Sequence, residues 1–207
     1  MAPENYHFCL EKTIDDEQLP PSNLQPPNLA SGPSSLALHK SKLWRTGTKL
    51  RVKFIGGGGS KFVRERVTYY AQQWETYANI DFRFVTDDDP DAEIWVSFVA
   101  DGNSWSFIGT DNLRIPKNEP TMNFGWFNDQ TSEQEFSRTT IHEFGHALGC
   151  VHEYQSPKAN IDWDLPKLYE YFAASGWDKN KVDSQIVNRL MTNQVEATLL
   201  DINSCCG

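Results

Sequence analysis

Three histidines and one glutamate within a short segment are the residues of this sequence best suited to chemistry. Residues 142–152 read His-Glu-Phe-Gly-His-Ala-Leu-Gly-Cys-Val-His. On a helix, His142 and His146 lie one turn apart on the same face, so both imidazoles can bind one metal ion at ~2.0–2.1 Å. Glu143 is rotated by about 100° from His142. It can therefore reach a water molecule on that metal, which is the position of a general base.

Gly149 indicates how a third ligand joins this pair. Glycine tolerates the left-handed conformation that ends a helix and turns the chain sharply, which would return His152 to the metal. Three neutral imidazoles leave one position open, as in catalytic rather than structural zinc sites. The alternative is that these histidines are merely satisfied on a polar helix face, but the chain has only 5 histidines in all. We therefore expect one catalytic zinc ion held by His142, His146 and His152, with Glu143 as the catalytic residue.

The segments around the motif predict an α+β domain that positions it. Leu50, Val52 and Phe54 alternate with charged residues, which predicts a half-buried strand over 49–55 that ends at four glycines. Apolar residues recur on one face of 61–79, which predicts a helix. Further strands are expected at 80–85, 93–99 and 121–127, and further helices from Thr131 or Ser132 to Gly149, at 166–174 and at 179–191.

The N-terminal region differs in composition from the rest. Residues 1–42 are dense in Pro, Ser and Asn, and such a segment buries too little apolar surface to offset its ordering entropy. We expect a tail or linker there, followed by one catalytic domain over residues 43–207.

Composition excludes several classes of partner. The net charge of -9 argues against nucleic acid, whose phosphates require basic patches, and no apolar run is long enough for a membrane span. No signal peptide is visible, and the 4 cysteines lack the spacing of a disulfide framework or a cysteine-based zinc site. At face value the chain is a cytoplasmic, reduced monomer, although the mature fragment of a secreted precursor would look the same.

The elongated histidine motif resembles that of the metzincin zinc peptidases, and Glu153 after the third histidine points to their astacin-like branch. Segments 43–50, 104–110, 121–126 and 152–157 resemble a microbial, astacin-related group. The resemblance covers roughly residues 43–200. It implies a zinc metalloendopeptidase acting on proteins or peptides. The implied fold is metzincin-like, with a twisted, mostly antiparallel or mixed sheet, two long helices in an upper lobe and a small, incomplete helical lower lobe.

The resemblance also implies a place for the substrate. The strand formed by Met122, Asn123, Phe124, Gly125 and Trp126 would offer an open edge to an extended peptide. An ordinary edge strand with core aromatic residues is the alternative from sequence. In astacin-like enzymes the residue matching Glu153 pairs with the new N-terminus after activation, but no cleavage site is evident here.

One expected element departs from the family pattern. A Ser-x-Met-x-Tyr turn should lie beneath the zinc site, but Met191 lacks both the serine and the tyrosine. The better alignment places the turn at residues 201–204, after which the chain reads Cys205-Cys206-Gly207. A natural truncation, an altered splice or an error in the gene prediction would explain this. Loss of the turn would weaken zinc binding or activity by ~10–100-fold. An inactive, zinc-binding remnant that serves as an interaction module, or has no function, is therefore the alternative to an active peptidase.

Overall fold

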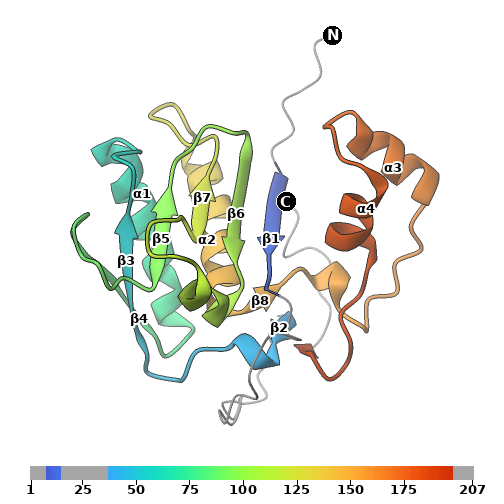
Figure 1. Cartoon of the computed structure of the whole chain (residues 1–207), viewed down its shortest axis with the longest axis horizontal. Helices are drawn as coiled ribbons and strands as arrows, with labels where there is room; N and C mark the ends of the chain where they lie inside the picture. The colour runs from blue at the N-terminus through green and yellow to red at the C-terminus, as the bar shows by residue number, and fades with distance from the viewer. Residues whose placement is uncertain (1–7, 15–36, 198–207) are drawn as a thin grey trace.

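The computed structural model describes residues 8–14 and 37–197. Within these ranges a six-stranded sheet has the order β1-β6-β7-β5-β3-β4, and a small three-stranded sheet has the order β8-β2-β9 (Figure 1). The elements are β1 (Phe8–Lys12), β2 (Ala37–His39), η2 (Lys40–Lys42), β3 (Lys49–Phe54), α1 (Lys61–Ala71), η3 (Gln72–Thr76), β4 (Asp81–Phe84), β5 (Ile94–Ser97), β6 (Asn103–Phe107), η4 (Gly109–Arg114), β7 (Met122–Phe124), α2 (Glu133–Leu148), β8 (Cys150–Val151), η5 (Glu153–Gln155), α3 (Leu165–Ala173), α4 (Lys179–Val182), η6 (Asp183–Val187) and β9 (Val195–Ala197).

The α+β class and the mixed sheet are confirmed. Strand β3 pairs in parallel with both β4 and β5, β5 pairs in parallel with β7, and β6 and β7 run antiparallel. Parallel pairs therefore predominate in the large sheet, whereas the family resemblance implied a mostly antiparallel or mixed sheet. Helix α1 supplies the long crossover that a parallel connection from β3 to β4 requires.

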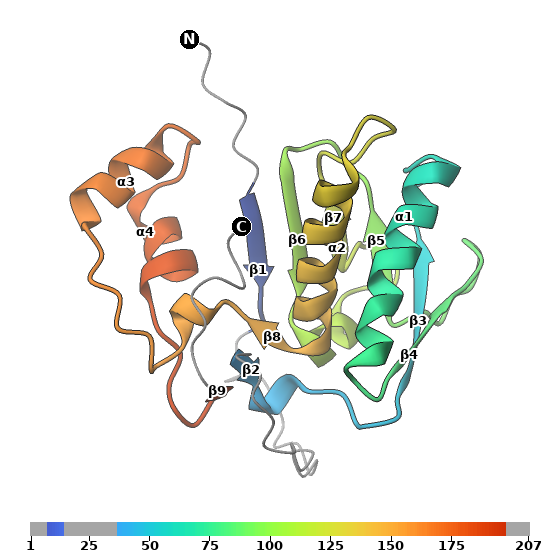
Figure 2. The same ribbon diagram turned by 180° about the vertical axis from the view of Figure 1, so that it is seen from behind.

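Helices α1 and α2 lie side by side over one face of the large sheet (Figure 2). The core between these helices and the sheet is formed by buried apolar side chains. They include Val63 and Val67 of α1, Phe144 of α2, and Leu50 and Val52 of β3. The expected helix over 61–79 is shorter than predicted, because α1 gives way to the 3-10 helix η3 at Gln72. This layer anchors α2, the helix that carries the histidine motif.

The expected boundary at residue 43 was wrong, because segments on its N-terminal side belong to the fold. Strand β1 pairs in parallel with β6, and β2 joins the small sheet. Lys42 and Asp111 form a buried ion pair at 2.7 Å. The same two side chains bind the backbone of Ile14: Lys42 Nζ donates to its carbonyl at 2.9 Å, and its amide donates to Asp111 at 2.9 Å. Residues 8–14 are thus attached to the domain in two ways: β1 pairs with β6, and the backbone of Ile14 binds the Lys42–Asp111 ion pair.

The smaller lobe contains α3, α4 and η6. The helix expected over 179–191 breaks into α4 and a π-helical turn that ends at Val187. Met191 is 68% exposed, consistent with a surface methionine. The turn predicted at residues 201–204 lies outside the described residues. No helix among those described is both long and apolar enough to cross a membrane.

Candidate metal centre

Helix α2 begins and ends where its sequence predicts. Ser132 caps it by accepting a hydrogen bond from the Glu135 amide at 3.2 Å. It ends at Gly149, which has a φ of 109° and donates its amide to the His146 carbonyl at 2.8 Å. A Cβ atom at Gly149 would lie 2.7 Å from Leu43 Cδ2. Glycine is therefore required here both by conformation and by space.

Two tryptophans fix the position of α2 on the sheet. Trp44 Nε1 donates to the Ala147 carbonyl at 2.7 Å, and Trp74 Nε1 donates to the Ile141 carbonyl at 2.9 Å. Trp74 also packs closely on Gly145, where a Cβ atom would lie 3.1 Å from its ring. These contacts hold the helix in one register, so the direction in which its histidines point is fixed by the core.

The three predicted ligands meet at one point. His142 Nε2 lies 3.0 Å from His146 Nε2 and 3.2 Å from His152 Nε2. Tetrahedral bonds of 2.0–2.1 Å to zinc would separate such nitrogens by about 3.3 Å. Nitrogen atoms at this spacing, drawn from two turns of α2 and from the chain beyond Gly149, fit a zinc ion held by three imidazoles.

The other ring nitrogens have partners that orient the imidazoles. His146 Nδ1 lies 2.9 Å from the Cys150 carbonyl, and His152 Nδ1 lies 2.7 Å from the Tyr154 hydroxyl. A proton on each Nδ1 leaves the Nε2 lone pair facing the centre. Burial lowers the pKa of His146 to about 4, with the Cys150 carbonyl opposing the shift. Burial also lowers the pKa values of His142 and His152 well below the usual range, so all three rings are neutral, as ligands must be.

Glu143 is fully buried beside this centre. Neither of its carboxylate oxygens has a hydrogen-bond partner of standard geometry in the described part of the chain. Burial raises the pKa of Glu143 well above its usual value, and the neighbouring Cys9 thiol offsets part of the rise. Burying a carboxylate that makes no hydrogen bond of standard geometry is costly and needs an explanation. A water molecule at the metal would supply the missing hydrogen bond.

Strand β1 brings two residues to the centre that the sequence did not predict. Cys9 Sγ lies within 4.8 Å of ligand atoms of His142 and Glu143. Glu11 lies 3.1 Å from His152 Nδ1, accepts the His152 backbone amide, and has its pKa raised to about 8 by burial. Cys9 and Glu11 are two apart in a strand and so share one face. The alternation of side chains along residues 8–12 was the signal available in the sequence. It was overlooked because residues 1–42 as a whole are rich in Pro and Ser.

The predicted substrate strand is not an open edge. Strand β7, which contains Met122, Asn123 and Phe124, is paired on one side with β5 and on the other with β6. The expectation of an open edge was wrong, because strand order depends on distant segments. Gly125 and Trp126 follow β7, and Trp126 Nε1 donates to Glu135 at 3.0 Å, which holds the start of α2. On this side of the sheet β1 forms the edge, and β6 lies between β1 and β7.

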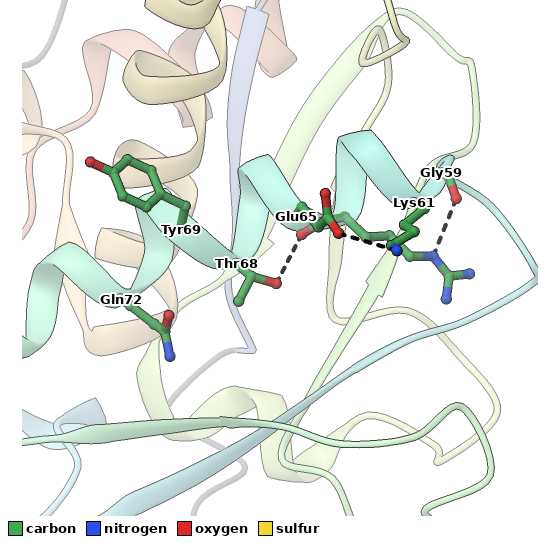
Figure 3. A pocket seen from close by; sticks show the side chains of 7 residues that line it. Gly59, Lys61, Glu65, Thr68, Tyr69 and Gln72 are labelled. Atoms are coloured by element: carbon green, nitrogen blue, oxygen red, sulfur yellow. Dashed lines mark hydrogen bonds and ion pairs between the residues drawn. The ribbon is translucent and has the colours of Figure 1, made fainter.

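A shallow groove follows one face of α1, away from these residues (Figure 3). It is lined by Gly59, Lys61, Arg64, Glu65, Thr68, Tyr69 and Gln72. None of the candidate metal ligands lines it, so the groove is no part of the metal centre.

Comparison with solved structures gives clear relatives. A structure of myroilysin matches with 46% sequence identity and a TM-score of 0.76, over 80% of this chain and 79% of that one. A crystal structure of myroilysin matches with 41% identity and a TM-score of 0.58, over 84% of this chain and 66% of that one. A hatching-enzyme zinc-protease from Oryzias latipes (medaka), high choriolytic enzyme 1, matches at 16% identity with a TM-score of 0.48, over 74% of this chain and 66% of that one, and is too distant to bear on function.

No family model and no curated protein matches the chain. The identity to myroilysin extends over four fifths of the chain, and the histidine motif lies within the same fold. The chain therefore belongs to the same family as myroilysin, the astacin-like zinc metalloendopeptidases of the metzincin group.

Proposed function

We propose that this chain hydrolyses peptide bonds within proteins, with His142, His146 and His152 as zinc ligands and Glu143 as general base and general acid. The observation that carries the proposal is the position of His142 Nε2, 3.0 Å from His146 Nε2 and 3.2 Å from His152 Nε2. Beside them lies the buried Glu143 carboxylate, which makes no hydrogen bond of standard geometry in the described part of the chain. A structural zinc site would need a fourth protein ligand and no such carboxylate.

Zinc held by these imidazoles would supply Lewis-acid chemistry, polarising a peptide carbonyl and allowing water to lose its proton near neutral pH. Glu143 accepts that proton on a carboxylate oxygen and later donates it to the leaving amine. Burial raises the pKa of Glu143, which favours the acid form that donates the proton. Cys150 and Tyr154 keep the rings of His146 and His152 in the required orientation throughout.

An extended peptide would bind along β6, in the place that β1 occupies at the edge of the sheet. The parallel pairing of Phe8–Lys12 with Asn103–Phe107 supports this, because β6 already forms backbone hydrogen bonds to an extended segment. A substrate can use the same edge only when β1 has left it. Full activity therefore requires displacement of β1.

Zinc-dependent cleavage of an unfolded protein tests the proposal. Three forms of the full chain are compared: the parent, a Cys9→Ala/Glu11→Ala variant that weakens the hold on β1, and that variant with Glu143→Ala added. We expect cleavage by the second form, loss of cleavage with a chelator, and no cleavage by the third form although it still binds zinc.

Zinc content measured on the same samples separates the alternatives. One zinc ion per chain without cleavage in any form would contradict the proposal and favour an inactive zinc-binding module. Loss of zinc together with activity in the Glu143→Ala form would contradict the division of roles between ligands and base.

A further inference from the structure

An apolar cluster in the smaller lobe includes one residue from β1. Three residues are buried together: Phe172 of α3, Trp177 of the segment between α3 and α4, and Val182 of α4. The rings of Phe172 and Trp177 stack at 4.7 Å between centroids. Leu168, Tyr169, Ile186 and Val187 are partly buried around them, and Leu10 of β1 packs against the same cluster. Leu10 thus reaches it from a segment more than a hundred residues away in sequence. Figure 1 shows β1 lying between β6 and α4.

The two faces of β1 have different surroundings. Cys9 and Glu11 face the metal centre. Leu10 and Lys12 face the other way, and the Lys12 amine lies 3.1 Å from the centroid of the Trp105 ring on β6. Because side chains alternate along any strand, a peptide that replaced β1 would also present one residue to the α3–α4 cluster next to a residue facing the zinc ligands.

We propose that the α3–α4 cluster is a specificity pocket that takes a large aliphatic or aromatic side chain of the substrate. The inference rests on the function proposed above, and it identifies the substrate class as peptides with such a residue within two positions of the cut bond. In the full chain Leu10 fills the pocket.

The chemistry of the cluster explains the preference. Its buried members, Phe172, Trp177 and Val182, present carbon surface, and the nearby Tyr169 hydroxyl already donates to Asp183 at 2.6 Å. A charged side chain placed among this carbon surface would lose its hydration, whereas a large apolar side chain would bury its surface. Small residues would leave a void beside the stacked rings.

The first experiment needs no catalysis. The zinc-loaded full chain is treated with iodoacetamide, and mass spectrometry follows alkylation of Cys9, with buried Cys150 as the reference thiol. Leu10→Ala should raise the Cys9 rate about 10-fold, because half of a leucine's burial is lost. Leu10→Asp should raise it further, and Leu10→Phe should keep it near the parent rate. Thr13→Ala, an exposed residue just beyond β1, is the matched control and should change nothing.

The second experiment reads the preference directly. The Cys9→Ala/Glu11→Ala form cleaves a mixed peptide library, and the cut sites are sequenced. We expect Leu, Ile, Met, Phe or Trp to be enriched at one position within two residues of the cut bond. Adding Ile186→Ala, which enlarges the pocket, should shift that preference towards bulkier side chains.

The two experiments separate the inference from the function on which it rests. Absence of cleavage in every form would overturn the proposed function, while the alkylation rates would still decide whether the pocket selects apolar residues. Equal rates for Leu10→Ala, Leu10→Asp and the parent would overturn the pocket, as would cleavage with no apolar preference at any position.

Discussion

Replacement of Gly149 by alanine should weaken both the fold and the zinc site. At a φ of 109° an alanine is strained, and its Cβ would lie 2.7 Å from Leu43 Cδ2 and 3.7 Å from the Lys42 carbonyl oxygen. Strain of this kind costs about 1–3 kcal/mol of the free energy of unfolding. For a domain of 150–250 residues each kcal/mol shifts the melting temperature by about 2–4 °C, so this strain corresponds to roughly 2–12 °C.

The same change should lower zinc affinity, because the turn at Gly149 sets the position of His152. Relief of the clash with Leu43 would move the chain beyond the helix, and misplaced ligand supports typically cost ~10–100-fold in affinity. Urea unfolding of the zinc-free chain gives the stability, and competition with a calibrated chelator gives the affinity. Both measurements use the full chain.

Gly47→Ala is the matched control. Gly47 also has a positive φ, 83°, but a Cβ atom there would meet nothing within 4 Å, and the residue lies in a loop before β3. It should lose stability from backbone strain while its zinc affinity stays at the parent value. If Gly149→Ala keeps parental zinc affinity while losing stability, the turn does not position His152 and the reasoning is wrong.

Three further changes probe other contacts. Tyr154→Phe removes the hydroxyl 2.7 Å from His152 Nδ1 and should lower zinc affinity ~10-fold without altering the urea midpoint of the zinc-free chain, whereas equal affinity would show that the hydroxyl does not orient the ring. Lys42→Met leaves the Asp111 carboxylate buried without its cation and should cost about 3–5 kcal/mol in urea unfolding; adding Asp111→Leu should recover part of the loss, and a change below about 1 kcal/mol would contradict a stabilising pair. Chelation of zinc should lower the melting temperature of the parent but not that of a His142→Ala/His146→Ala variant, and an equal fall in both would place the metal elsewhere.

The sequence could predict those parts of the centre that depend on local periodicity. The i, i+4 spacing of His142 and His146 fixes their common face on any helix, and the caps at Ser132 and Gly149 use signals within a few residues. The strand β3 was predictable in the same way, because Leu50, Val52 and Phe54 alternate with charged residues. These features need no knowledge of the rest of the fold.

Strand order was not predictable, because it is decided by segments far apart in the chain. The run Met122–Phe124 has the same apolar character whether it lies at an edge or between two partners, so its position between β5 and β6 could not be read from its residues. Strand β1 is a stronger case, since its five residues carry too little periodicity to identify.

Contacts within one segment and contacts between distant segments have different roles in this site. The proposed metal ligands come from one segment of eleven residues, so their chemistry is visible in sequence. Access to that chemistry depends on pairs such as Glu11 with His152, 141 residues apart, and Leu10 with the α3–α4 cluster. Such pairs form only in the folded chain, because the entropy lost on closing a long loop must be offset by the burial of apolar surface. For this protein the type of reaction can therefore be inferred from the motif, whereas the substrate it admits has to be inferred from the structure around β1.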